Sequence, residues 1–365
     1  MTEPMKKPVA GPEPTAGPRP AAPPHPLPRD ARVLVVRLDS FGDVLLAGPA
    51  VRAVAEHAAH VAFLCGPQGT AAARLLPEVD EVLTWAAPWE GTDPPEVADA
   101  GFAETTARLR EGRYDAALVL TSFHQSPLPA ALMLRLAGVP YIGADSVDHP
   151  GRLLDVRHQR AEGRHEAEAA VDTAAAMGFT PGRWDDGRLA VVPPPDTDAL
   201  TGHGPYVVVH PGASAPARTW PAQRWHEAVE LLADCGHRVV VTGGPGEKAL
   251  TREVAGGTAI DLGGRTDARG LAGVLNLADA VVCGNTGPAH LAAAVGTPVV
   301  SLFAPVVPAE RWRPYGVPLV LLGDQQAPCA GSRARRCPVA GHPCLTEVTA
   351  QDVLRAVRKL IEEAR

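Results

Sequence analysis

The sequence predicts an α/β fold built from two Rossmann-like domains in tandem. Short β-branched apolar runs alternate with helical segments, and this alternation restarts after a stretch rich in Asp, Gly and Pro near residue 190. Several of the predicted strands end in turns rich in glycine. The 365 residues, of which 45% are hydrophobic, suffice for two buried cores.

The first half begins with Arg-Val-Leu-Val-Val-Arg at residues 32–37, which predicts a buried parallel strand. A polar turn and a helix from Asp43 follow it. Further strands are expected at 60–65, 114–121 and 139–143, with helices near Thr70 and Pro127. This repeated pairing predicts an α/β domain over residues 31–185.

Residues 186–204 show no apolar periodicity and contain three consecutive prolines, which favours a linker. Beyond it, a second domain is expected over residues 205–348. Its strands are expected at 206–210, 238–242, 259–262, 280–282 and 298–303, and its helices at 221–234, after Gly246, at 269–278 and from the turn at 283–290. A C-terminal helix, residues 349–365, has an amphipathic pattern from Ala350 to Ala364.

Residues 1–30 hold ten of the 38 prolines and almost no large apolar side chain, so we expect a disordered Pro-rich tail. No apolar run suits a signal peptide, and none approaches the roughly 20 residues that cross a bilayer. We therefore expect a cytoplasmic protein with reduced cysteines, and leave open contact with the inner face of the membrane. The net charge of −7 argues against nucleic acid as a partner.

The turn from Cys283 to His290 joins an apolar strand to an alanine-rich helix. Gly284 and Gly287 allow close approach of a ligand to the backbone, and Pro288 suits a first helical position. Free N–H groups at a helix start attract anions, so the turn predicts a phosphate-bearing ligand.

Glycine-rich or small polar turns follow four predicted strands of the second half, at 210–214, 243–247, 263–266 and 284–290. Ligands of open parallel sheets bind at the carboxyl ends of the strands, so four such turns favour a nucleotide pocket. The sequence contains no Walker A motif, because no Ser or Thr follows Lys248. It also lacks a G-x-G-x-x-G fingerprint after Val36.

Five stretches of the chain together resemble one family. They are Ser40-Phe41-Gly42-Asp43 with Pro49-Ala50; His210 to Ser214 with Arg218, Trp220-Pro221 and Trp225; Gly243 to Glu247; Asn285 to Leu291 with Pro298 to Phe303; and the cysteine-bearing end Cys329 to Cys344. In this order they are similar to glycosyltransferase family 9, the ADP-heptose:lipopolysaccharide heptosyltransferases. The resemblance implies a GT-B architecture, in which an N-terminal acceptor-binding domain and a C-terminal nucleotide-sugar-binding domain face each other across a cleft.

The resemblance also implies an inverting glycosyltransferase that moves a heptose-like sugar from an ADP-linked donor to a glycan, glycolipid or small-molecule acceptor. Asp43 matches the family's proposed general base, and a helix start favours its ionised form. The alternative role is a helix-capping Asp. An alternative function is nucleotide-sugar binding without turnover, because Arg218 stands where the family usually has Lys and Asn285 where it has Asp.

On the donor side, Arg218 would grip the diphosphate with a forked guanidinium, and Ser214 with the N–H groups near Thr286 and Gly287 would add hydrogen bonds. Glu247 would accept from ribose hydroxyls, or is an ordinary acid of a first helical turn.

His290 would contact donor phosphate or sugar, or is a structural histidine. Asn285 keeps a hydrogen-bonding amide but not the charge, which leaves the donor sugar open. On the acceptor side, Ser40, Gly42, His124 and Gln125 follow first-domain strands and are expected to face the acceptor.

The residues Cys329, Cys337, His342 and Cys344 have a spacing that matches no usual zinc site, so ordinary thiols or a local disulfide are favoured over a metal. The nearby basic run at 333–336 fits a solvated loop, an anionic acceptor or lipid head groups. No D-x-D motif is expected in a cleft-facing turn, so we expect no required cofactor and leave Mg²⁺ stimulation open.

Overall fold

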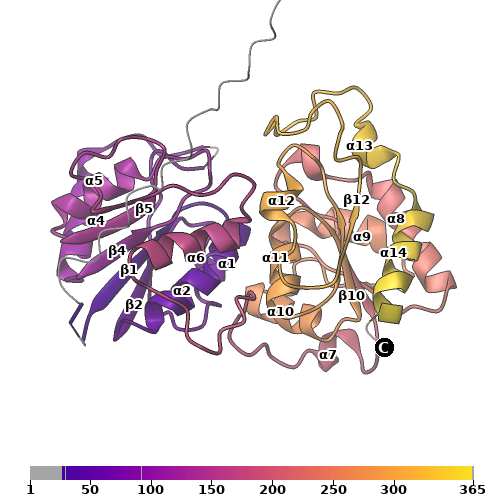
Figure 1. Cartoon of the computed structure of the whole chain (residues 1–365). Helices are drawn as coiled ribbons and strands as arrows, with labels where there is room; N and C mark the ends of the chain where they lie inside the picture. Colours follow the sequence, from indigo (N-terminus) through magenta and orange to yellow (C-terminus); the bar gives the residue numbers. More distant parts are fainter. Residues whose placement is uncertain (1–26, 29, 92, 364–365) are drawn as a thin grey trace, which may run out of the picture.

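The computed structural model describes residues 27–28, 30–91 and 93–363, which form two parallel sheets flanked by helices (Figure 1). The tail expected over residues 1–30 lies outside the described residues except for positions 27, 28 and 30. In the described part of the chain, no helix has both the length and the apolar character needed to cross a bilayer.

The first sheet has the strand order β3-β2-β1-β4-β5-β6, all parallel. Its strands are β1 (Arg32–Arg37), β2 (His60–Cys65), β3 (Glu81–Thr84), β4 (Ala116–Val119), β5 (Tyr141–Asp145) and β6 (Val156–His158). Its helices are α1 (Phe41–Leu46), α2 (Gly48–Ala55), α3 (Thr70–Ala73), α4 (Asp99–Glu111), α5 (Leu128–Leu136) and α6 (Glu166–Ala176).

The central strand β1 is apolar because helices cover both faces of its sheet. Val33 and Val35 pack in one core with residues of α1, α2 and α6, whereas Leu34 and Val36 pack in another with residues of α4 and α5. Figure 1 shows these two helix layers on opposite sides of the sheet.

The second sheet has the order β12-β11-β10-β7-β8-β9, also parallel. Its strands are β7 (Val207–His210), β8 (Val239–Val241), β9 (Ile260–Asp261), β10 (Ala280–Gly284), β11 (Val299–Leu302) and β12 (Leu319–Leu322). The helical segments are α7 (Asp198–Thr201), η1 (Pro216–Arg218), α8 (Ala222–Asp234), η2 (Pro245–Glu247), α9 (Lys248–Ala255), α10 (Ala268–Asn276), α11 (Gly287–Ala294), α12 (Ala309–Trp312), α13 (Pro343–Thr346) and α14 (Ala350–Glu363).

Counted within each domain, both sheets have the strand order 3-2-1-4-5-6 of a Rossmann-like fold, which confirms the predicted fold class. In the first sheet, successive strands are added in one direction from β1 and in the opposite direction from β4. The same change occurs between β7 and β10 in the second sheet. Ligands bind at such switch points, outside the carboxyl ends of the strands.

The strands predicted at 32–37 and 60–65 are confirmed residue for residue, whereas the one predicted at 139–143 begins two residues later, at Tyr141. The short strands β3, β6 and β12 were not predicted. The segment expected as a linker contains helix α7, in which Thr201 is buried.

Candidate functional site

The switch points of the two sheets meet where α1 contacts α11. A Cβ added at Gly42 would lie 2.7 Å from Cδ2 of His290 and 3.4 Å from Cα of Gly287, and one added at Gly287 would lie 2.9 Å from Cδ1 of Phe41. The absence of both side chains therefore lets the two helices touch. The sequence analysis related Gly287 to ligand approach and did not anticipate this contact between domains.

Asp43 lies in the first turn of α1, and its carboxylate has three side-chain partners. Oδ2 accepts from Ser40 Oγ at 2.6 Å, while Oδ1 accepts from Arg37 Nη2 at 3.3 Å and from Trp312 Nε1 at 3.2 Å. Burial raises the pKa of Asp43, but the charge of Arg37 and the hydrogen bonds from Ser40 and Trp312 outweigh it and leave the pKa below its usual range. The carboxylate is therefore ionised at neutral pH.

Arg37, the last residue of β1, is a buried cation that contacts three acidic groups and is linked to a fourth. Its Nε donates to Asp39 at 2.6 Å and its Nη2 lies 3.5 Å from Glu166 Oε2 as well as close to Asp43. Burial lowers the pKa of Arg37, but the surrounding carboxylates raise it further, so the guanidinium stays charged. The fourth acid, Asp145, is reached through a second cation.

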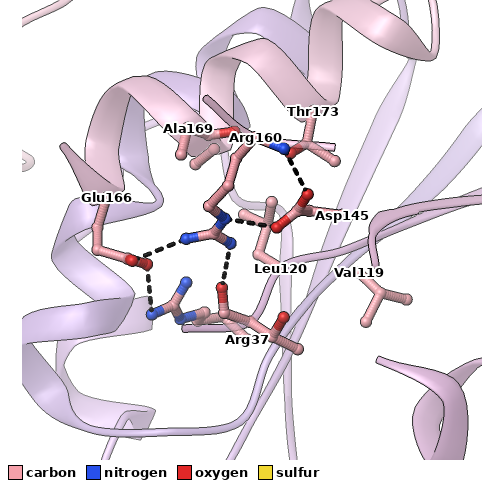
Figure 2. Close-up of a pocket in the computed structure, with 10 residues that line it drawn as sticks. Arg37, Val119, Leu120, Asp145, Arg160, Glu166, Ala169 and Thr173 are labelled. Atoms are coloured by element: carbon pink, nitrogen blue, oxygen red, sulfur yellow. Dashed lines mark hydrogen bonds and ion pairs between the residues drawn. The ribbon is translucent and has the colours of Figure 1, made fainter. Parts of the chain in front are cut away.

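That second cation is Arg160, which continues the network on the far side of Glu166 (Figure 2). Its Nη1 lies 2.8 Å from Glu166 Oε1, its Nε pairs with Asp145, and its Nη2 donates to the carbonyl of Thr121 at 2.8 Å. Arg37, Arg160 and Glu166 all line one small pocket. Sequence analysis did not identify these residues, although an Arg at the buried end of an apolar strand was a usable signal.

Asp39 is a second carboxylate close to Asp43 that the sequence analysis also missed. It accepts from Arg37 Nε and, at 3.0 Å, from Ser122 Oγ. Burial raises the pKa of Asp39 to about 7, with the charge of Arg37 opposing the shift. The two neighbouring carboxylates therefore have pKa values displaced in opposite directions.

The other predicted acceptor residues lie in the turn after β4. Gln125 has both amide groups engaged, since Oε1 accepts from Ser122 N–H at 2.7 Å and Nε2 donates to Glu90 at 2.7 Å. His124 is exposed and its ring lies edge-on to Phe123, with centroids 5.3 Å apart. Burial of part of the ring and the charge of Arg333 lower the pKa of His124 to about 4.

Arg218 presents a cation from the second domain. Its Nε is buried without a hydrogen-bond partner, and among the described residues no ion pair involves its guanidinium. Burial lowers the pKa of Arg218, whereas Asp43, facing it from the first domain, raises it. Its carbonyl oxygen lies 3.0 Å from the position that a Cβ on Gly284 would occupy, which places η1 beside the end of β10.

Helix α11 begins next to Arg218, with Thr286 as its N-cap and Pro288 in its first turn as predicted. The Thr286 side chain makes no capping hydrogen bond. His290 is buried, and its Nδ1 has no partner in the described structure. Burial lowers the pKa of His290 to about 4 against the opposing charge of Asp43, so the imidazole is neutral at pH 7.

Glu247 and Ser214 lie farther along the same rim. Glu247 Oε2 accepts from Gly244 N–H at 2.7 Å and lies 4.0 Å from Nε2 of His210. A Cβ on Gly212 would collide with the Glu247 carboxylate, so this glycine makes room for it. Ser214 is exposed, and its carbonyl accepts from Arg335 Nη2 at 3.2 Å.

Asn285 is buried, and its amide is directed at the protein backbone. Nδ2 donates to the carbonyl of Ala304 at 3.3 Å, and Oδ1 accepts from the N–H of Ala304 at 3.4 Å. The residue therefore ties the turn after β10 to the segment that follows β11.

That segment, residues 303–316, leads from β11 toward β12 within the second domain, contacts the first domain, and is called the strap below. Besides Trp312 on Asp43, its Arg313 carbonyl lies 2.9 Å from Nε2 of His165, and its Tyr315 hydroxyl donates to Glu168 at 3.1 Å. The rings of His165 and Tyr315 stack at 4.6 Å. Helix α12, within the strap, lies on the side of the second domain that faces the first (Figure 1).

The cysteine-bearing end lies near η1, since Nε2 of His342 is 3.1 Å from the carbonyl of Ala217. Cys329, Cys337 and Cys344 are free thiols, and burial raises the pKa of Cys344 to about 11. Within the described ranges, no group of three or more His, Cys, Asp or Glu side chains is arranged to hold a metal ion.

The family model that matches the chain is Glycosyltransferase family 9 (heptosyltransferase), over residues 103–342. Lipopolysaccharide heptosyltransferase 1 of Pseudomonas aeruginosa is 30% identical over 319 residues, which cover 84% of this chain and 87% of that protein.

Two solved structures share the fold. A glycosyltransferase family 9 protein of Veillonella parvula has a TM-score of 0.73 at 17% identity, covering 93% of this chain and 100% of its own. The E. coli heptosyltransferase WaaC with ADP-2-deoxy-2-fluoro heptose has a TM-score of 0.62 at 22% identity, covering 92% and 100%. Both are compatible with a GT-B arrangement of the two domains.

Proposed function

Because the chain belongs to glycosyltransferase family 9 and is a glycosyltransferase, we propose that it transfers a heptose-like sugar from an ADP-linked donor to a glycan, glycolipid or small-molecule acceptor. One observation carries the proposal: the ionised carboxylate of Asp43 faces the unpaired guanidinium of Arg218 from the opposite domain. A base and a cation so opposed suit displacement of a diphosphate by a hydroxyl group. The matched relative of Pseudomonas aeruginosa is a lipopolysaccharide heptosyltransferase, which supports lipopolysaccharide core as an acceptor class.

In the proposed reaction, the acceptor hydroxyl oxygen bonds to the anomeric carbon while the bond from that carbon to the diphosphate breaks. Asp43 takes the hydroxyl proton, and the diphosphate leaves with the bonding electrons. Attack from the face opposite the leaving group inverts the anomeric configuration. Asp43 suits the base because its Oδ1 and Oδ2 are oriented by donors on three sides.

On the donor side, we assign the diphosphate to Arg218 and to the N–H groups at the start of α11, with Ser214 as a further donor. Arg218 is suited because a bound phosphate would satisfy its buried Nε. Glu247 would bind the ribose hydroxyls, and neutral His290 would donate or accept one hydrogen bond to the departing group. Asn285, with its amide on Ala304, would act through the backbone of its turn.

The acceptor side carries cations as well as carboxylates. Arg311 lies over the Phe123 ring at 4.5 Å and has a buried Nη1 without a hydrogen-bond partner, and Arg333 is close enough to His124 to shift its pKa. We propose an acceptor with an anionic group, as in an acidic glycan or glycolipid. Peripheral membrane contact belongs to the glycolipid case and is tested by flotation with acidic vesicles.

The cations Arg218 and Arg311 supply positive charge to the cleft, so we propose that transfer requires no metal ion. EDTA is then expected to leave the rate within about twofold, with Mg²⁺ giving at most modest stimulation. Abolition of transfer by EDTA and its restoration by Mg²⁺ would contradict this proposal.

The test measures nucleoside diphosphate release by purified protein with ADP-heptose, and with other nucleotide-linked sugars as controls for the donor. Release that depends on an added acceptor supports transfer. Donor binding without release, across all acceptor classes tried, would instead support the alternative of a nucleotide-sugar-binding protein. Asn285 and Arg218 motivate that alternative because both depart from the family pattern.

A further inference from the structure

Trp312 is the only side chain of the described second domain that donates a hydrogen bond to the Asp43 carboxylate, and it does so across 269 positions of the sequence. The remaining donors to this carboxylate, Ser40 and Arg37, come from the same domain as Asp43. Orientation of the base is thus shared between domains, and the second domain contributes through the strap alone.

The strap is anchored at both ends. At its start, the amide of Asn285 bonds both backbone groups of Ala304, so the strap is tied to the turn that leads into α11. Toward its end, Tyr315 bonds to Glu168 of α6 and stacks on His165. Movement of the turn after β10 is therefore transmitted to Trp312 through a short stretch of chain.

The indole N–H also occupies a particular position on the carboxylate. It binds Oδ1, the oxygen that Arg37 shares, whereas Oδ2 binds Ser40 at the exposed helix start. With Oδ1 held from both domains, the carboxylate plane cannot rotate without breaking two hydrogen bonds, so Oδ2 stays directed to the edge from which an acceptor hydroxyl can approach.

We propose that Trp312 is a positioning residue for the general base, and that it acts through its own hydrogen bond from the second domain to the Asp43 carboxylate. This inference rests on the proposed function, because it assigns to Asp43 the role of base. It goes beyond that function in naming a residue of the donor domain that controls the acceptor chemistry. Donor binding at the turn after β10 would then favour the oriented base.

The variant Trp312→Phe keeps an aromatic side chain, although a smaller one, and removes the N–H donor. We expect kcat to fall about tenfold, as for loss of one hydrogen bond to a charged group, with the donor KM within about twofold. Because the lost hydrogen bond stabilised the ionised form, the acid limb of the pH profile should move to higher pH. Trp312→His, which retains a ring N–H, should recover part of the loss.

The substitution leaves the titratable and charged neighbours of Asp43 in place, namely Arg37, Asp39, Glu90, His124, Glu166, Arg218 and His290. Tyr315→Phe is the matched control, because it removes a different cross-domain hydrogen bond of the strap without touching Asp43. The control should leave the acid limb unmoved. An equal shift in both variants, or an unchanged or higher kcat in Trp312→Phe, would overturn the proposal.

A measurement that does not depend on turnover tests the Trp312 contact separately from the proposed function. The carboxyl carbon of Asp43, assigned by comparison with Asp43→Asn, is titrated by ¹³C NMR in the wild type and in Trp312→Phe. A titration moved to higher pH in the variant supports the positioning contact even if no acceptor is turned over, in which case the proposed function fails alone. An unmoved titration overturns the contact whatever the activity.

Discussion

The two faces of the cleft differ in how completely their polar groups are paired. On the first-domain face, Asp43 has three side-chain partners and Arg37 contacts Asp39, Asp43 and Glu166. On the second-domain face, the buried Nε of Arg218 and the buried Nδ1 of His290 have no partner in the described structure.

Buried polar groups are nearly always hydrogen-bonded, so unpaired ones at a cleft are candidates for ligand contacts. The comparison teaches that the protein itself supplies hydrogen bonds to Asp43, whereas in the proposed function a bound donor would supply them to Arg218 and His290. Preorganised groups cost little reorganisation during the reaction, which suits the proton-transfer step. Each face can be tested separately.

The largest expected effect is on the paired face. Asp43→Asn keeps the shape and the hydrogen bond from Ser40 but removes the basic group, so kcat should fall about 100- to 10,000-fold. Donor affinity, measured by calorimetry with ADP, should stay within about twofold because the proposed ADP site lies on the other face. Activity close to wild type would remove Asp43 from the role of base.

The next effect is on stability. Glu166→Ala removes the buried carboxylate that Arg37 and Arg160 share, and should reduce the free energy of unfolding by about 3 kcal/mol in urea denaturation. Asp172→Ala, on the same helix, breaks a more exposed pair with Arg164 and should cost about 1 kcal/mol or less. Equal losses in the two variants would show that the buried ion pairs of Glu166 contribute no more to stability than the exposed pair of Arg164.

A smaller effect is expected on the unpaired face. Arg218→Ala should lower kcat/KM about 30-fold through loss of charge-assisted hydrogen bonds to the diphosphate, with little change in folding stability. Arg218→Lys should restore part of the rate, because it keeps the charge and loses the fork. ADP affinity that is unchanged in Arg218→Ala would place the diphosphate elsewhere.

The smallest effect concerns His290 and pH. Its pKa lies near 4 in the folded protein and near 6.5 when unfolded, so the unfolded chain binds more protons between these values. This contribution is present above about pH 6.5 and is lost as the pH falls toward 4. His290→Gln should therefore lessen the loss of stability between pH 7 and pH 5 by about 1 kcal/mol.

Urea midpoints at the two pH values provide the measurement for His290→Gln. His203→Gln is the control, since the His203 side chain is exposed. A pH dependence identical to that of the wild type would mean that His290 is solvated in the folded state.

The sequence was sufficient for the fold because its central strands are apolar on both faces. Strand β1 was predicted with its bounds, whereas β3 and β6 were missed because they are short and carry polar residues such as Glu81 and Arg157. Edge strands are buried less, so their pattern is weaker. Helix α6 was missed because its alanine-rich sequence shows little periodicity.

For the site, the gathering of the turns that carry Asp43 and His290 could be predicted, because residues after strands of parallel sheets lie at one edge. The roles of Asp43 and Arg218 came from the family resemblance and stay predictions. Trp312 and Glu166 could not be predicted, because their roles depend on contacts between segments 269 and 129 positions apart in the chain. The engagement of Asn285 with Ala304 was also not predictable, since a buried amide can bond backbone or ligand equally well.

The contact of Gly42 with Gly287 determines how closely the two domains approach each other at the cleft. With no methyl group on either residue, α1 and α11 lie in direct contact, Gly42 against His290 and Gly287 against Phe41, and the separation between Asp43 and the helix start opposite is determined there. A single alanine at position 42 would add a methyl group at this contact and push the two helices apart. The distance between the two domains across which the sugar is transferred therefore depends on glycine, which has no Cβ, at both positions.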